Sequence, residues 1–290
     1  PEPTRSHFVA QDLLETGAPR GEPLRNGWLN RALSHLPQTG SRLGLSVGYE
    51  IPTILRGNNP VASWAPSWLP EATPDLLDKL ADIYQDDPLL SKALNEGRYA
   101  REMSERVIGG NDVMRRGNLR RERQFGTLAE AAARLLAAPD GARLAVIEMG
   151  GWDTHTNQVN RLQRNLQLLG NGLAVIPKSL GTAWKDTVVV VATEFGRTVR
   201  ANGTKGTDHG TASAALVLGG SVAGGRVATD WPSLAPDRLY KNRDLAATAD
   251  IRGLFKAVLR DHFGLSHIDV ERSIFPDSAN AKPPPGKIIS

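Results

Sequence analysis

The stretch Leu144-Ala-Val-Ile-Glu-Met-Gly-Gly-Trp-Asp153-Thr-His155 decides the fold class of this chain. Its first four residues are apolar without alternation, which is typical of a strand covered on both faces. Two glycines then free the backbone to turn, and a carboxylate and an imidazole follow at once. We therefore predict a buried strand that ends in a loop carrying polar side chains.

Two further apolar runs, at 187–192 and 214–218, lie on the far side of a helical stripe of apolar residues between Val159 and Ile176. Buried strands separated by an amphipathic helix predict an α/β fold, a three-layer α/β/α sandwich with a largely parallel sheet. Ligands gather at the carboxyl ends of such strands. Glu194 follows the second strand, at the same predicted edge as the loop after the first.

The remaining segments are predicted to complete one domain over residues 1–290. A short helix is expected at His7–Glu15, with Thr4 or Ser6 as its cap and Gly17 as its end. Turn formers dominate residues 40–74. A mainly helical insertion is expected at about 60–140, because apolar residues recur at helical spacing after Thr73-Pro74.

Composition narrows the classes of protein that this chain can belong to. It has 290 residues and no cysteine, so any metal must be held by His, Asp or Glu. Its apolar runs fall short of the roughly 20 residues of a transmembrane helix. The net charge is only +4, and the arginine cluster at Met114–Arg123 has no aromatic residues between its charges. A solvated surface is a better interpretation than nucleic-acid binding.

Five residues are candidate metal ligands. Asp153 and His155 combine oxygen and nitrogen donors suited to zinc or manganese, although an Asp that caps the next helix and a packed His would look the same. Glu194 is a candidate or pairs with Arg197. Asp208-His209 is a second candidate pair, in which Asp208 can instead orient the imidazole. Three further histidines, His35, His262 and His267, are expected to be surface or packing residues.

Ser6 is a candidate nucleophile, because free backbone amides and the positive end of the helix dipole stabilise an anion at a helix start. The alternative is a plain N-cap. Arg5 or Arg197 would hold the oxygens of an anionic substrate by its planar guanidinium. The chain has no Walker loop and no dinucleotide fingerprint, which excludes the corresponding enzyme classes.

Four ordered motifs resemble the bacterial domain-of-unknown-function 1501 family, a branch of the alkaline phosphatase and sulfatase superfamily usually exported by the twin-arginine route. They are Arg5-Ser-His-Phe with Gln11-Asp12 and Glu15-Thr-Gly17, Gly150-Gly-Trp-Asp-Thr-His155, Thr193-Glu-Phe-Gly-Arg-Thr198 and Gly206-Thr-Asp-His-Gly210. The resemblance implies an alkaline phosphatase-like sandwich and an exported protein, periplasmic or extracellular. The start at Pro1-Glu-Pro3 has no initiator Met, and we expect a processed or truncated chain.

The same resemblance implies roles for individual residues. Ser6 matches the nucleophile, Asp153 and His155 match an Asp and a His of the first metal, and His209 matches the last metal-binding His. Glu194 falls where the superfamily has the Asp of an Asp-His dipeptide, but Phe195 replaces that histidine. The family's first strand region, with a metal-binding Asp, is expected upstream of Pro1, so this chain would lack it.

Together these features predict an exported, metal-dependent hydrolase of small phosphate or sulfate esters that uses zinc, manganese or calcium. The alternative is a non-catalytic binding or scaffold protein that retains the fold and an anion- or metal-binding cleft. A third reading is a basic surface that binds polyanions, which would be sensitive to salt. Nucleic acid is not expected as a partner, and the sequence leaves the oligomeric state open.

Overall fold

The computed structural model describes residues 4–18, 24–37, 43–66, 72–109 and 124–290. The structural statements below refer to these residues. The arginine cluster at Met114–Arg123 and the start at Pro1–Pro3 lie outside the described residues, so the predictions made for them stay predictions.

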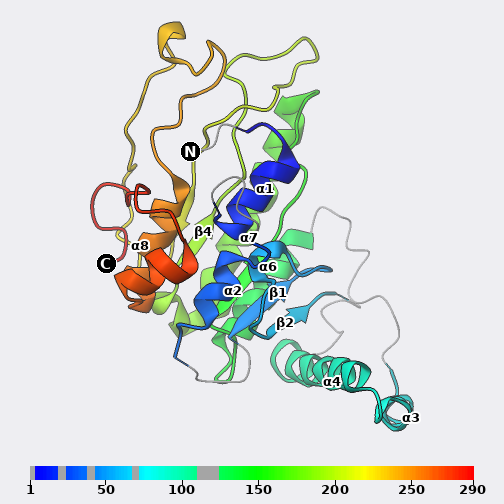
Figure 1. The fold of residues 1–290 in the computed structure, drawn as a ribbon. Helices are drawn as coiled ribbons and strands as arrows, with labels where there is room; N and C mark the ends of the chain where they lie inside the picture. The colour runs from blue at the N-terminus through cyan, green and yellow to red at the C-terminus, as the bar shows by residue number, and fades with distance from the viewer. Residues whose placement is uncertain (1–3, 19–23, 38–42, 67–71, 110–123) are drawn as a thin grey trace.

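A three-stranded parallel sheet forms the centre of the molecule (Figure 1). Its strands are β1 (Gly44–Val47), β2 (Val61–Trp64) and β3 (Leu144–Ile147), in the order β2-β1-β3. The α/β class and the strand at 144–147 are thereby confirmed. Strands β1 and β2 fall where turn formers were predicted, because four-residue strands between glycines and prolines are too short to give a periodic signal.

A second, two-stranded sheet joins β4 (Val189–Val191) and β5 (Leu216–Leu218). The pair is antiparallel, so the expectation of parallel strands is wrong at this point. Parallel neighbours need a crossover connection, usually a helix. The chain from 192 to 215 contains no helix and returns along β4 in the opposite direction.

Helices cover both faces of the parallel sheet. On one face α2 (Trp28–Leu33) and α8 (Ile251–Phe263) bury Trp28 and Phe255 against Leu144. On the other face α6 (Gln124–Ala137) buries Leu128 and Leu135 against the side chains of β1. Helix α7 (Gln158–Leu180), at the predicted stripe, packs on α6 through Ile176 and Leu180. Burial on both faces explains why the strands lack alternation.

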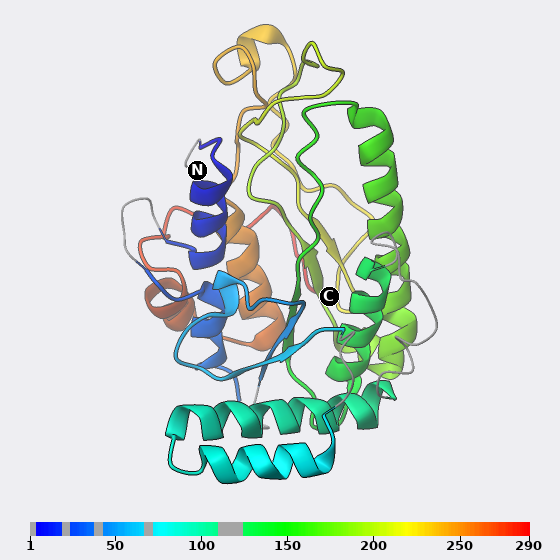
Figure 2. The ribbon, with the colours of Figure 1, turned by 90° about the vertical axis from the view of Figure 1, so that its right-hand side faces the viewer.

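The expected helical insertion contains an antiparallel hairpin, α3 (Pro74–Tyr84) and α4 (Pro88–Ile108). Thr73 caps α3 by accepting a hydrogen bond from the amide of Leu76, as its position before Pro74 predicts. The hairpin lies at the end of the molecule opposite the start of α1 (Figures 1 and 2). It is therefore remote from the N-terminal segment that carries Ser6.

Helix α1 (His7–Thr16) matches the predicted helix. Gly17 ends it with φ 66°, a left-handed conformation that glycine adopts without strain. Ser6 occupies the cap position but its side chain makes no cap hydrogen bond, and its own amide donates to Thr4 Oγ1. Ser6 therefore stands at the predicted N-cap position, but its side chain does not cap the helix.

The shorter helical turns are η1 (Thr53–Leu55), η3 (Gly181–Asp186), η4 (Pro236–Arg238) and the π-type η5 (Asp269–Ile274). Within the described ranges, no helix combines the length and the apolar character needed to cross a bilayer.

Candidate metal centre

Three segments far apart in the sequence meet beyond the carboxyl ends of β3 and β4: residues 4–7, the loop 150–157 and the loop 193–210. Glycine makes two of these approaches possible. Gly151 has φ 94°, which few other residues adopt. A Cβ on Gly206 would lie 2.0 Å from the carbonyl oxygen of His155, so only glycine fits there.

Three donor atoms form a near-equilateral triangle. Asp153 Oδ1 lies 2.9 Å from His155 Nε2 and 3.0 Å from His209 Nε2, and the two Nε2 atoms are 2.9 Å apart. The corners of such a triangle are about 1.7 Å from its centre, within the roughly 2.0–2.2 Å reach of zinc bonds to nitrogen and oxygen. One divalent ion can therefore contact all three atoms, and the residues present fit a metal.

Hydrogen bonds on the opposite ring nitrogens orient these two imidazoles. His209 Nδ1 is 2.8 Å from the carbonyl oxygen of Arg5, and His155 Nδ1 is 3.2 Å from Asp208 Oδ1. Both partners accept hydrogen bonds, so a neutral ring has its proton on Nδ1 and its lone pair on Nε2. Two such lone pairs 2.9 Å apart beside a carboxylate repel one another, so this place attracts a cation, either a proton on Nε2 that is donated to Asp153 or a metal ion.

A third histidine, His7, enters the centre from the start of α1. Its Nδ1 lies 2.7 Å from Glu194 Oε1, while its Nε2 is buried without a hydrogen-bond partner among the described residues. One ligand atom each from His7, Asp153 and His209 lie within 4.8 Å of one another. Sequence reasoning missed His7, and the one available signal was a histidine beside the candidate Ser6 at a helix start.

The candidate ligands Glu194 and Asp208 each contact the Nδ1 atom of a histidine. Carboxylates in this place fix the ring and raise its basicity as a ligand. Burial raises the pKa of Glu194, but hydrogen bonds from Thr193, its own backbone and His7 outweigh burial and lower it. Hydrogen bonds from Asn202 and His155 lower the pKa of Asp208. Both groups are therefore ready to accept hydrogen bonds as anions.

Asn202, which the sequence did not single out, joins the two loops of the centre. Its Nδ2 donates to the carbonyl oxygen of His155 and to Asp208 Oδ1, at 3.0 Å each. Its Oδ1 accepts from the amides of Thr204 and Gly206. Because every polar atom of the amide is used, Asn202 holds His155 and its carboxylate partner in one arrangement.

The two arginines expected to bind substrate both contact carboxylates. Arg5 places Nη2 2.6 Å and Nε 2.9 Å from Oδ2 of the fully buried Asp244. Arg197 Nη1 lies 2.7 Å from Asp153 Oδ1, and Nη2 donates to the carbonyl oxygen of Thr207. Arg197 thus adds positive charge beside the donor triangle, whereas Arg5 contributes its carbonyl oxygen. Ser6, between Arg5 and His7, is exposed.

Phe195 packs against the histidines instead of supplying a ligand. Its ring centroid is 4.7 Å from that of His7 and 4.8 Å from that of His209. Phe195 is 7% exposed, so it closes one side of the centre with apolar surface. A dry wall of this kind strengthens the electrostatic interactions of the groups beside it.

Asp153 has the most strongly shifted carboxyl group of the centre. Burial raises its pKa, but hydrogen bonds from Arg197 and His209 and the charge of His155 outweigh burial and lower the pKa to about 2. A lowered pKa stabilises the fold at pH values above the ordinary pKa, and the contribution is lost as pH falls from about 3.8 towards about 2. The side chain is 47% exposed, so screening limits the effect to less than about 1 kcal/mol.

We therefore expect the metal-free protein to lose its stability advantage over Asp153→Asn in acid. With a chelator present, urea denaturation would give a difference of up to about 1 kcal/mol at neutral pH and a smaller one near pH 3. A difference that stays constant over this range would contradict the lowered pKa.

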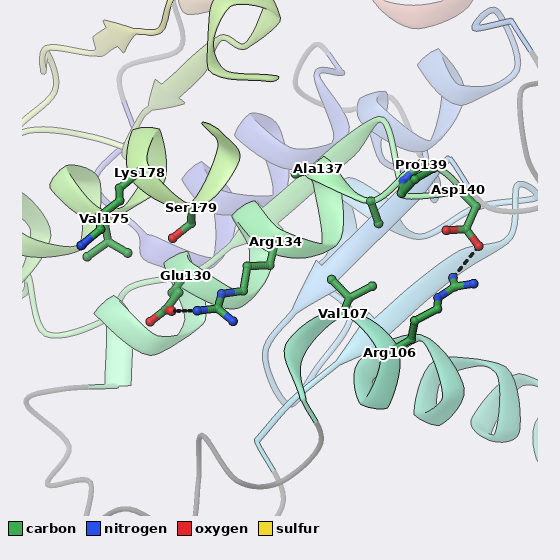
Figure 3. A pocket seen from close by; sticks show the side chains of 11 residues that line it. Arg106, Val107, Glu130, Arg134, Ala137, Pro139, Asp140, Val175, Lys178 and Ser179 are labelled. Carbon is green, nitrogen blue, oxygen red and sulfur yellow. Dashed lines mark hydrogen bonds and ion pairs between the residues drawn. The ribbon is translucent and has the colours of Figure 1, made fainter. Parts of the chain in front are cut away.

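The structure also contains a cavity of about 930 Å³ between α4, α6 and α7 (Figure 3). Arg106 pairs with Asp140 and Arg134 pairs with Glu130 at its wall. Its α7 residues lie about 25–32 Å along the helix from Gln158, at 1.5 Å per residue. The cavity is lined by no histidine and is remote from the donor triangle, so we take the triangle as the functional site.

Neither the curated proteins nor the solved structures include a match to this chain. A family model described as protein of unknown function (DUF1501) matches residues 1–274. This match spans all four motifs and the residues of the metal centre. The chain belongs to the DUF1501 family.

Proposed function

We propose that this protein is a metal-dependent hydrolase of phosphate or sulfate esters. The observation that carries the proposal is the donor triangle of Asp153, His155 and His209, in which Asp153 Oδ1 and the two Nε2 atoms lie within 3.0 Å of one another. The resemblance to the alkaline phosphatase and sulfatase superfamily supports the same proposal, and the proposal includes the sandwich fold of that superfamily. Export to the periplasm or the cell exterior rests on the resemblance alone.

The donor set indicates which ion fits. Zinc and manganese accept imidazole nitrogen together with carboxylate oxygen, whereas calcium takes oxygen ligands. The two imidazoles therefore favour zinc or manganese over calcium among the three ions considered. When bound, the ion would supply Lewis-acid polarisation of an ester oxygen.

Side chains and backbone amides of the protein would supply the nucleophile and the groups that bind the anionic ester. Ser6 is exposed beside the centre, and we assign its hydroxyl as the nucleophile that attacks phosphorus or sulfur. The bond to the alcohol of the substrate breaks as the Ser6 ester forms, and water then hydrolyses that ester. The first amides of α1 have no partners within the helix, so they can donate to a bound anion. Arg197, at 2.7 Å from Asp153, places a positive charge where an anionic ester would lie. Together these groups favour an anion at the start of α1.

A second candidate function is non-catalytic binding of an anion or a metal ion. It is favoured by the engagement of both candidate substrate arginines: Arg5 contacts Asp244 and Arg197 contacts Asp153. A guanidinium already paired with a carboxylate holds a substrate oxygen less readily. A binding protein needs only the centre and its positive surroundings.

Metal content tests both functions. Elemental mass spectrometry after reconstitution with zinc or manganese should find stoichiometric metal in the wild type and background levels in Asp153→Ala. Asp237→Ala is the matched control, because among the described residues the ion pair of this exposed carboxylate is with its neighbour Arg238.

The metal-loaded wild type is then assayed for hydrolysis of p-nitrophenyl phosphate, bis(p-nitrophenyl) phosphate and p-nitrophenyl sulfate. Metal without hydrolysis would support the binding function, and absence of metal in the wild type would refute the proposed centre.

A further inference from the structure

The Nε2 atom of His7 is a buried polar atom without a hydrogen bond, and it faces the metal centre. Its nearest recorded partner is Asp153 Oδ2, at 3.5 Å, which is too long for a hydrogen bond of good geometry. An unsatisfied buried polar atom costs about 1–3 kcal/mol, and native structures seldom retain one without a function. The arrangement of His7 therefore calls for a cation at Nε2.

We propose that His7 is a ligand of this centre, and that metal binding therefore fastens the first turn of α1 to the loops that carry Asp153 and His209. The inference rests on the proposed metal function and deepens it. It adds a ligand from the N-terminal segment and assigns to the metal a structural effect on that segment.

The surroundings of His7 repeat the arrangement found at the other two histidines. Its Nδ1, at 2.7 Å from Glu194 Oε1, must carry the proton because a carboxylate only accepts, so the Nε2 lone pair of a neutral ring points inward. Carboxylate partners of this kind orient metal-binding histidines. Phe195 and His209 pack on the ring with centroids 4.7 Å and 4.4 Å away, which limits its rotation.

Two overlapping sets of donors result. His155, His209 and Asp153 Oδ1 form the donor triangle, while His7, His209 and Asp153 form a second set within 4.8 Å. Because the sets share His209 and Asp153, a metal in the centre lies within reach of Nε2 of His7 after a small movement of the ring.

The first turn of α1 packs lightly on the rest of the fold. Phe8 is 88% exposed and Val9 36% exposed, and the buried residue of the turn is Ala10, which has its smallest side chain; Glu15 and Thr16 are buried at the other end of the helix. The turn is held by His7 to Glu194 and by the Arg5 side chain and carbonyl. A metal bond to His7 would therefore make local unfolding of this turn rarer, and it would affect the well-packed C-terminal end of the helix less.

Zinc titration by calorimetry tests the ligand. Outer contacts of a metal site cost 10–100-fold in affinity when removed, so loss of a direct ligand in His7→Ala should weaken binding by more than about 100-fold. His35→Ala is the matched control, because its ring also lies beside a carboxylate, 3.4 Å from Asp269, in a remote part of the fold. Its affinity should equal that of the wild type.

Hydrogen exchange tests whether metal binding holds the first turn of α1 to the loops of the centre. The amide of Ala10 donates to the carbonyl oxygen of Ser6 at 2.9 Å and reports on the first turn of α1. With zinc at 100 times its Kd, openings that release the metal become about 100-fold rarer, and exchange of this amide should slow by up to that factor in the wild type. The slowing should vanish in His7→Ala.

The outcomes separate the inference from the proposed function. If His7→Ala binds zinc like the wild type while Asp153→Ala does not, the inference is wrong and the metal function stands. If the wild type binds no metal, both fail. If circular dichroism shows His7→Ala to be unfolded, His7→Gln takes its place, since a side-chain amide can still donate to Glu194. Retained affinity in that folded variant overturns the inference in the same way.

Discussion

Replacement of His209 with alanine is expected to remove metal binding and ester hydrolysis together. His209 Nε2 belongs to both donor sets, at 3.0 Å from Asp153 Oδ1 and 2.9 Å from His155 Nε2. Its loss leaves each donor set with one carboxylate and one imidazole, and such a set binds zinc far more weakly than a set with a further nitrogen. We expect affinity to fall by more than about 100-fold, beyond the 10–100-fold cost of removing an outer contact.

Elemental mass spectrometry and hydrolysis of a p-nitrophenyl ester check this expectation on the same preparations. His267→Ala is the matched control, because His267 is 68% exposed and its nearest recorded carboxylate oxygen, on Glu271, is 3.9 Å away. The control should keep metal and activity. A His209→Ala protein that retains both would defeat the assignment of the centre, whatever the behaviour of the other variants.

The sequence predicted those parts of the fold that carry a periodic or capping signal. Helix α1 was located by its candidate cap residues and by Gly17, and α7 by its stripe of apolar residues. Strand β3 was found as an unbroken apolar run. The short strands β1 and β2 gave no such signal, because their pairing depends on contacts with β3 that only the folded chain supplies.

The site divides in the same way. Asp153, His155 and His209 were found from local spacing and from the ordered motifs. The sequence could not show whether Glu194 and Asp208 bind the metal directly or hydrogen-bond to Nδ1 of a metal-binding histidine. Both roles require a carboxylate in the same loops. His7 was missed as a member of the centre since its contacts, Glu194 and Asp153, are distant in sequence. Contacts between residues so far apart in the sequence cannot be predicted from a local pattern.

Replacement of Arg5 with alanine is expected to destabilise the fold by up to about 3–5 kcal/mol, the usual cost of taking the hydrogen-bonded partner from a buried charge. Asp244 has no exposed side-chain surface, and Arg5 is the residue that hydrogen-bonds to its Oδ2. The Oδ1 atom of Asp244 has no hydrogen bond among the described residues, and the Nε atom of Arg243 lies 3.8 Å from it, beyond hydrogen-bond distance. The carboxylate therefore depends on Arg5 more than an exposed carboxylate would. Urea denaturation of the metal-free protein measures the change.

Two further variants show whether the buried charge is the cause. Arg106→Ala breaks an exposed pair, with Arg106 60% and Asp140 49% exposed, and should cost less than about 1 kcal/mol. In Arg5→Ala/Asp244→Asn the unpaired charge is gone, so this protein should be more stable than Arg5→Ala by about 1–3 kcal/mol. If Arg5→Ala is as stable as the wild type and loses only affinity for anions, Arg5 binds substrate and the pair with Asp244 contributes little. If the double variant recovers stability, Arg5 serves the centre by holding the N-terminal segment, and its carbonyl oxygen, against His209.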